Sequence, residues 1–334
     1  MLTLKPTNAD APIPFDEFMR HAARHYYAHH NPFGAAGDFV TAPDISQIFG
    51  ELIGLWVAAT WQTKQSPTPF TVLELGPGRG TLMADALRAI GQAMPACLSA
   101  VRLHLLESSP ALRAQQTQTL AIHNPVFIDD LSTLPAQPLI VVANEFFDAL
   151  PVAQYRLYQG QWKQRAVQMR ADQYEWATLP INADAIPDYV RDHAPTDWME
   201  YNADSIAIMH ALARHIERYG GAMLIIDYGY AGPVVGDTVQ ALRHHQPHDV
   251  LQNVGDADIT AHVDFTALAQ AAQPLPCSFM PQGYFLHSFG GRERLAALCA
   301  HKDGPTQQEL YSGYERLTAP GQMGELFKVL TVNV

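Results

Sequence analysis

The spacing of apolar residues predicts two helices near the N-terminus. Between Ile13 and Tyr27 the apolar side chains recur every three or four positions, on a face formed by Phe15, Phe18, Met19, Ala22 and Tyr26. A second set with the same period follows at Ile45, Ile48, Phe49, Leu52 and Trp56. Residues 31–46 contain glycines and prolines but no period. We therefore expect residues 1–66 to form an N-terminal helical extension whose inner loop acts as a lid.

Short, continuous apolar runs predict buried strands farther along the chain. They lie at residues 70–75, 101–106, 138–143, 222–226 and 326–334. The run at 139–143 is typical of a central parallel strand that is covered on both faces. Helical patterns alternate with these strands, which predicts an α/β fold with a mostly parallel sheet and helices on both faces. Near the C-terminus we expect helices over 265–272 and 292–300, with a strand over 282–289 between them.

Two segments interrupt the alternation. Residues 155–167 predict an antiparallel hairpin that turns near Gly160, and residues 183–219 are expected to be mostly helical. We interpret residues 152–219 as an insertion that forms a wall of the substrate site, so that the main domain comprises residues 67–151 and 220–334. Residues 231–264 read as a long irregular loop, and a loop of this length is usually functional.

The first strand of the sheet ends in a glycine-rich turn, Leu73-Glu-Leu-Gly-Pro-Gly-Arg-Gly-Thr81. A strand, a glycine turn and a helix bring backbone N–H groups and a helix N-terminus against a ligand. Gly76, Gly78 and Gly80 alternate as G-x-G-x-G, which differs from the G-x-G-x-x-G of dinucleotide binders. Glu74 would repel a pyrophosphate, but it suits a ligand with an ammonium and a sulfonium group. The turn therefore favours S-adenosylmethionine (SAM) over another nucleotide or a plain tight turn.

Polar side chains follow the next strands. Glu107 closes the second strand, where an acid can accept both ribose hydroxyls of a nucleoside. Asp129 follows a short strand and could accept from the adenine amino group, or simply cap a turn. Asn144, Glu145 and Asp148 follow the central strand, at the edge where open α/β sheets bind ligands. We assign Asn144 to the cofactor and the two acids to chemistry, although all three could merely cap the junction.

Composition and charge narrow the possible functions and cellular locations of the protein. The 334 residues carry a formal net charge of −12, which argues against binding nucleic acid and fits a cationic partner better. Three widely spaced cysteines and 15 histidines without carboxylate-spaced partners predict neither a disulfide framework nor a metal site. No apolar run reaches membrane-spanning length, and the N-terminus lacks a signal-peptide core. We expect a cytoplasmic protein.

Five motifs occur in order along nearly the whole chain. They are Gly37-Asp-Phe-Val-Thr-Ala-Pro-Asp-Ile-Ser46, the glycine turn, Asn144-Glu-Phe-Phe-Asp-Ala-Leu-Pro151, Asp227-Tyr-Gly229 and Asp258-Ile-Thr-Ala-His-Val-Asp-Phe265. Together they resemble the MidA-like family of SAM-dependent methyltransferases. One departure is Asp44, where the family usually has glutamate.

The resemblance implies a class I methyltransferase fold, with a seven-stranded sheet whose last strand is antiparallel. Mitochondrial members of the family help to assemble respiratory complex I by methylating an arginine of one of its subunits. The implied partner is a protein substrate bearing an arginine, and the oligomeric state stays open between monomer and homodimer.

An arginine guanidinium is a poor nucleophile because its charge is delocalised. Two carboxylates that hold two of its nitrogens would leave the third nitrogen free to attack. Glu145 and Asp148 are our candidates for this pair, as similar paired acids follow this strand in other arginine methyltransferases, and Asp38 or Asp227 could replace either acid. The expected substrate contacts are Phe39, Thr41, Phe147, Asp227, Tyr228 and His262.

Two other functions stay open. Asn144-Glu-Phe-Phe lies where amino-methylases of nucleic acid carry Asn-Pro-Pro-Tyr, but the prolines are missing here. A SAM-binding assembly factor without turnover is the second alternative.

Overall fold

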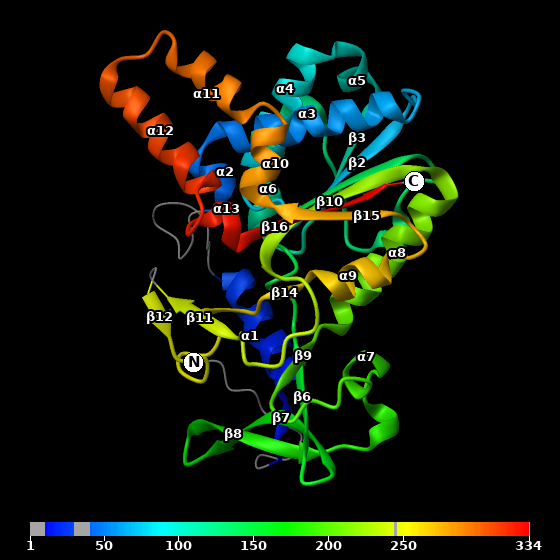
Figure 1. The fold of residues 1–334 in the computed structure, drawn as a ribbon, viewed down its shortest axis with the longest axis vertical. Helices are drawn as coiled ribbons and strands as arrows, with labels where there is room; N and C mark the ends of the chain where they lie inside the picture. Colours follow the sequence, from blue (N-terminus) through cyan, green and yellow to red (C-terminus); the bar gives the residue numbers. More distant parts are fainter. Residues whose placement is uncertain (1–10, 30–40, 244–245, 334) are drawn as a thin grey trace. The chain divides into compact units, whose positions relative to one another are not determined.

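The sheet strands and helices predicted above form two units in the computed structural model, which describes residues 11–29, 41–243 and 246–333 (Figure 1). One unit comprises residues 1–32, 147–207 and 230–267, and we call it the insertion unit. The other comprises residues 33–146, 208–229 and 268–334, and we call it the sheet unit. Of the expected insertion, residues 152–207 share a unit with N-terminal residues and with 230–267, whereas residues 208–219 belong to the sheet unit.

Seven strands form the sheet of the sheet unit, in the order β15-β16-β10-β5-β2-β3-β4. Their bounds are β2 Phe70–Leu75, β3 Val101–Leu106, β4 Val126–Ile128, β5 Leu139–Asn144, β10 Gly221–Tyr230, β15 Cys277–Pro281 and β16 Phe327–Asn333. β4, β3, β2, β5 and β10 run parallel. β16 runs antiparallel between β10 and β15. The expected class I methyltransferase sheet, with its antiparallel last strand, is confirmed.

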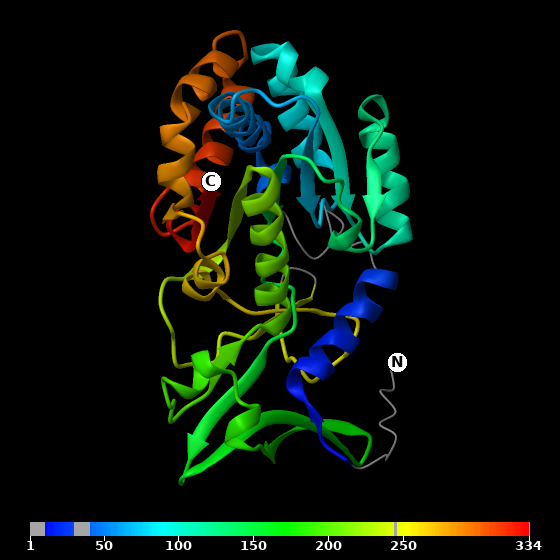
Figure 2. The ribbon, with the colours of Figure 1, turned by 90° about the vertical axis from the view of Figure 1, so that its right-hand side faces the viewer.

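Helices cover both faces of this sheet (Figure 1, Figure 2). One face packs against α3 (Gln47–Thr63), α4 (Thr81–Ala93), α5 (Pro95–Ala100), α10 (Gln282–Ser288), α11 (Gly291–Cys299) and α12 (Gly304–Thr318). The core between them includes Val72, Ile140 and Leu224 from the strands. The last part of α8 (Ala203–Tyr219) covers the opposite face with the buried side chains of Met209, Leu212 and Ile216.

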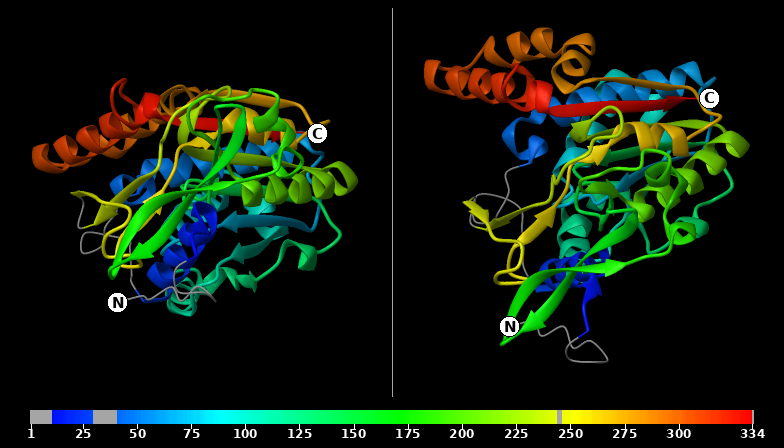
Figure 3. Two further views of the ribbon diagram at one scale, coloured as in Figure 1. Left: turned by 90° about the horizontal axis from the view of Figure 1, so that it is seen from below. Right: turned by 60° about the horizontal axis from the view of Figure 1, so that its bottom comes forward.

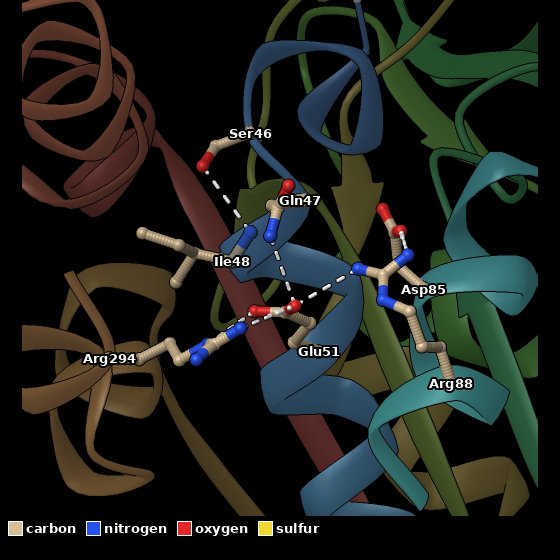
Figure 4. A network of polar contacts seen from close by, with 7 residues as sticks. All are labelled: Ser46, Gln47, Ile48, Glu51, Asp85, Arg88 and Arg294. Atoms are coloured by element: carbon tan, nitrogen blue, oxygen red, sulfur yellow. Dashed lines mark hydrogen bonds and ion pairs between the residues drawn. The ribbon is translucent and has the colours of Figure 1, made fainter. Parts of the chain in front are cut away.

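Two glycines let α3 and α4 approach closely. A Cβ atom on Gly54 would lie 2.3 Å from the backbone oxygen of Ala86, and one on Gly50 would lie 2.7 Å from Cβ of Asp85. Beside them the buried carboxylate of Glu51 accepts hydrogen bonds from Arg88 of α4 and Arg294 of α11 (Figure 4). Burial raises the pKa of Glu51, but these hydrogen bonds outweigh it and hold the pKa below its usual value.

The N-terminal helices differ in detail from the expectation. α1 (Phe15–His29) buries the predicted face of Phe15, Phe18, Met19, Ala22 and Tyr26. The second predicted helix is split into α2 (Ala42–Ile45) and α3, because the backbone at Ser46 is extended. The Ser46 hydroxyl accepts from the N–H of Ile48 at 3.3 Å and so caps α3. The lid expected at 31–46 lies mostly outside the described residues.

The insertion unit contains the predicted hairpin (Figure 3). β6 (Ala153–Tyr158) and β7 (Gln161–Arg170) are joined at Gln159 and Gly160, both with positive φ, and β8 (Gln173–Pro180) pairs with β7. β1 (Ile13–Pro14) and β9 (Met199–Tyr201) complete this sheet. Residues 183–219 are mostly helical, as expected: a 3-10 turn and α7 (Asp188–Arg191) precede β9, and α8 follows it.

Two further expectations were wrong. Residues 231–264 are not a structureless loop, because β11 (Gln240–Arg243), β12 (Gln246–His248) and β13 (Asp258–Thr260) form a small sheet. Residues 282–289 form helix α10 rather than a strand, since Phe285 and Leu286 bury into the core from a helix while β15 takes the strand position. No helix among the described residues is both long and apolar enough to cross a membrane.

Candidate active site

The glycine turn connects the C-terminal end of β2 to the N-terminus of α4. Gly76, Gly78 and Gly80 have φ values of 62°, 52° and 80°, a region that L side chains rarely adopt. A Cβ atom on Gly76 would also lie 2.8 Å from the ring of Phe146. Gly80 is the N-cap of α4 and offers no side-chain cap to its first turn, so the free N–H groups there are available to a ligand.

A cleft opens beside this turn in the sheet unit, with about 410 Å³ not occupied by protein atoms. Its walls are Thr41, Pro43, Asp44, Glu74, Gly76, Pro77, Gly78, Arg79, Thr81, Leu82, Asn144 and Glu145. Three of the twelve wall residues are acidic and one is basic, which favours a ligand with positive charge.

Glu74 is the most deeply buried acid of the cleft, with 3% of its surface exposed. Its Oε2 atom has no hydrogen-bond partner among the described residues. Burial, together with the nearby charge of Glu107, raises the pKa of Glu74 to about 8. A buried acceptor of this kind needs a donor or a positive charge, and the cationic end of SAM supplies both.

Glu107 follows β3 and is joined to the glycine turn through Gln116 of α6 (Pro110–Thr119). Gln116 donates from Nε2 to the Gly78 backbone oxygen at 2.7 Å and to Glu107 Oε2 at 3.1 Å. Glu107 Oε1 accepts from the N–H of Ser109 at 2.7 Å. Burial raises the pKa of Glu107, and these hydrogen bonds oppose the rise. Sequence reasoning missed Gln116, whose only signal is a polar residue on the apolar face that Leu112 begins.

Asp129 lies outside the cleft walls. Its side chain is 84% exposed and pairs with Arg113 of α6. The neighbouring Asp130 caps a short 3-10 helix by accepting from the N–H of Ser132 at 2.6 Å. A contact between Asp129 and the adenine amino group therefore stays a prediction.

Asn144 and Glu145 meet at the end of the central strand. Glu145 has φ of 50°, an unfavourable value for a residue with a side chain. Its N–H donates to the Ile226 oxygen at 2.9 Å, and its Oε1 accepts from the N–H of Ala42 at 3.2 Å and from Asn144 Nδ2 at 3.1 Å. Backbone strain of this kind is concentrated at functional sites, and here it places the carboxylate in the wall of the cleft.

Arg79 and Asp44 were not assigned any role from the sequence. Arg79 lies in the glycine turn, and its side chain forms an ion pair with Asp44 of α2. Thr41, an expected substrate contact, donates from Oγ1 to Asp44 Oδ2 at 3.2 Å. All three residues line the cleft.

Asp148 lies in the insertion unit, just after the chain leaves the sheet unit. It is buried, and its backbone oxygen accepts from the N–H of Ala261 at 3.0 Å. In the same unit Tyr27 donates to Asp258 at 3.3 Å. Burial, followed by the charges of Asp258 and Asp148, raises the pKa of Tyr27 well above its usual value. The insertion unit thus brings Asp148 and Asp258 near the same tyrosine, a grouping that the sequence order did not reveal.

The other expected substrate contacts are placed as follows. Asp227 is fully buried, and it accepts from the N–H of Phe146 at 3.2 Å and of Tyr228 at 3.0 Å. Phe147 is buried, and Tyr228 packs edge-on against Phe327 with ring centroids 5.5 Å apart. The N–H of His262 donates to Thr238 at 2.9 Å, and burial lowers the His262 pKa. Asp38 and Phe39 lie outside the described residues.

No group of three or more His, Cys, Asp or Glu side chains placed to hold a metal ion occurs within the described part of the chain. At the place where the sequence predicts the cofactor, the structure has a buried acid, a helix N-terminus and three glycines with left-handed backbone conformation. These groups fit SAM: Glu74 suits its positively charged groups, and the backbone N–H groups of the turn suit its polar atoms.

Comparisons with known proteins agree with SAM as the cofactor. The model of a family of S-adenosyl-L-methionine-dependent methyltransferases matches residues 52–279. The mitochondrial protein arginine methyltransferase NDUFAF7 homolog of Drosophila melanogaster is 34% identical over 363 residues, covering 96% of this chain and 81% of that protein. The protein arginine methyltransferase NDUFAF7 of Homo sapiens is 34% identical over 351 residues, covering 95% and 79%.

A solved structure is similar as well. A Burkholderia thailandensis protein bound to S-adenosyl-homocysteine superposes with a TM-score of 0.81 at 26% identity, covering 97% of this chain and 88% of that chain. Because the family model spans most of the chain and the relatives align along nearly all of it, the protein belongs to the MidA-like family of SAM-dependent methyltransferases.

Proposed function

We propose that this methyltransferase transfers methyl groups to an arginine of a protein substrate. The relatives named above are protein arginine methyltransferases, which supports this substrate class. The observation that carries the proposal is Glu145, whose carboxylate lines the cofactor cleft from a strained backbone at the end of the central strand. A strained acid beside a cofactor site is suited to bind a cationic substrate group.

Bound SAM supplies an electrophilic methyl group, which a nitrogen lone pair attacks as the carbon–sulfur bond breaks and the thioether leaves. The protein has to hold that nitrogen in line, because orientation contributes up to about 7–11 kcal/mol in such reactions. In our proposal Glu145 and Asp148 hold two guanidinium nitrogens, which localises the charge and frees the third nitrogen. Asp227 supports this arrangement by holding the N–H of Phe146, between the two acids in the chain.

The proposal also includes which protein is the substrate. The family resemblance favours a subunit of respiratory complex I, and the net charge of −12 favours a cationic protein segment over nucleic acid. The relatives are named mitochondrial.

The test uses lysate from cells that lack this protein. Purified enzyme and methyl-labelled SAM are added, and the labelled protein is hydrolysed to identify the modified amino acid. We expect label in methylarginine, lost with Glu145→Gln and retained with the exposed control Glu309→Gln on α12. Label in another amino acid would keep the methyltransferase but reject arginine. An absence of label despite SAM binding would favour an assembly factor without turnover, and label in nucleic acid would favour the other alternative.

A further inference from the structure

α2 is a single helical turn that forms one wall of the cofactor cleft. It comprises only Ala42–Ile45, and an isolated turn of this length is not stable by itself. Two polar contacts from other parts of the sheet unit hold its ends. Arg79 of the glycine turn pairs with Asp44, and Glu145 accepts from the N–H of Ala42 at 3.2 Å.

These contacts connect the glycine turn to Glu145 through α2. Arg79 belongs to the turn that binds the cofactor, and Asp44 is oriented on its other side by Thr41 Oγ1 at 3.2 Å. The Asp44 side chain is only 9% exposed, so solvent screens the ion pair weakly. From Asp44 the connection passes through the backbone of α2 to Ala42, and from there to the Glu145 carboxylate.

We propose that Arg79 and Asp44 are a positioning pair for methyl transfer: the ion pair fixes α2 to the cofactor turn, and α2 thereby aims the Glu145 carboxylate at the substrate guanidinium. This inference rests on the proposed role of Glu145 as a substrate acid. The pair sets the direction of the carboxylate relative to the methyl donor, while Glu74 and the glycines bind that donor.

The physical reason is the sensitivity of in-line transfer to geometry. Displacing a reacting group by about 1 Å can lower the rate about a hundredfold, even when binding is intact. Glu145 Oε1 accepts from the N–H of Ala42 on α2 and from the amide of Asn144, its neighbour in sequence. Loss of the α2 contact would remove the donor that links the carboxylate to the cofactor turn through α2, so its direction would no longer follow that turn.

The decisive variant is Asp44→Asn, which keeps the size of the side chain and removes its charge. We expect methylarginine formation at saturating SAM to fall about ten- to hundredfold, while the SAM dissociation constant measured by calorimetry changes less than about threefold. Asp44→Glu restores the charge and should recover most of the rate, since glutamate is the usual residue of the family here.

Asp85→Asn is the matched control. Asp85 has a side chain 12% exposed and pairs with Arg88 on α4, away from the cleft walls (Figure 4). It should lose a similar amount of stability and keep the wild-type rate. A purely structural role for Asp44 would make the two variants alike, and this outcome would overturn the proposal.

Two other outcomes show whether the positioning role or the proposed function is wrong. A SAM affinity that falls in parallel with the rate in Asp44→Asn would make the pair part of the cofactor site and overturn the positioning role. Glu145→Gln, measured in the same lysate assay, tests the proposed function itself. If Glu145→Gln is fully active, the substrate-acid role fails; if it is inactive while Asp44→Asn is active, only the positioning pair fails.

Discussion

Glu74 and Glu107 are two acids at neighbouring strand ends that the structure treats differently. Glu107 has both oxygens bonded, to Ser109 and Gln116, whereas Glu74 Oε2 has no partner among the described residues. Burial raises the pKa of both acids, to about 8 for Glu74. At the residue scale, we therefore expect Glu107 to be held in place before the cofactor binds, and Glu74 to become charged as the cofactor binds.

SAM binding should depend on pH through Glu74. Without cofactor, the folded protein favours the protonated form of Glu74. This contribution to the free energy of unfolding is fully present below pH about 4.5 and is lost as pH rises through about 8. Bound SAM reverses this preference because its positive charge favours the carboxylate. Affinity should then rise with pH, by up to about tenfold per pH unit below pH 8, with release of a proton. Calorimetry in buffers of different ionisation enthalpy measures that proton, and Glu74→Gln should abolish the pH dependence.

Glu107 and Asp148 should separate binding from transfer. We expect Glu107→Ala to weaken SAM binding, because it removes the acceptor that Gln116 and Ser109 hold in place. Asp148→Ala should keep SAM binding and lose transfer, at a cost of about 2–5 kcal/mol for removing one acid from a buried charge pair. Cofactor titrations and rate measurements on both proteins decide this, and similar behaviour of the two variants would contradict the division of roles.

At the element scale, the cofactor turn depends on how closely α4 packs against α3. Gly50 and Gly54 present no side chain toward Leu82 and Ala86, so the two helix backbones can lie in contact. The first turn of α4 also carries the uncapped N–H groups that we expect to bind the cofactor. The position of these groups is thus set by two glycines in a different helix.

Gly54→Ala should destabilise the protein although alanine is the better helix former. The gain of up to about 1 kcal/mol in helix propensity is outweighed by a Cβ atom 2.3 Å from the Ala86 backbone oxygen. We expect a net loss of about 1–3 kcal/mol in the free energy of unfolding. Gly91→Ala in α4 is the control, because its Cβ would meet only the flexible end of Leu98 at 2.9 Å. Denaturant unfolding of both variants gives the comparison, and equal midpoints would refute the close-packing argument.

At the scale of the whole molecule, the cofactor cleft belongs to the sheet unit alone. Every residue of its wall lies within 33–146, and the insertion unit contributes Asp148, Asp258 and Tyr27 to a separate grouping. We therefore expect cofactor binding and the substrate-side wall to be carried by different units of one chain.

SAM should protect one unit selectively from hydrogen exchange. At a concentration of 100 times the dissociation constant, the ligand stabilises the state that binds it by about 2.7 kcal/mol. We expect slower exchange at residues 41–46, 74–84 and 144–146, with little change in β6, β7 and β8. Glu74→Gln serves as the control with weakened binding. Equal protection in both units would show that they open together.

Local pattern was sufficient for much of the fold. Buried strands such as β2 and β5 and the apolar face of α1 were predicted nearly residue by residue, because burial on both faces or on one helical face leaves a periodic signal. The strand assigned to 282–289 failed because a short aromatic run fits a buried helix as well as a strand. The small sheet at 240–260 was missed because its three strands are too short to show a period.

The sequence by itself determined the cofactor class, since Glu74, Gly76, Gly78 and Gly80 lie within seven residues between a predicted strand and a predicted helix. Tertiary structure decided which distant residues support that site: Gln116 below the turn, Asp44 beside Arg79, and Ala42 against Glu145. These contacts join positions 35 to 103 residues apart. Local spacing cannot encode such contacts, because they depend on where packed elements bring side chains together in space.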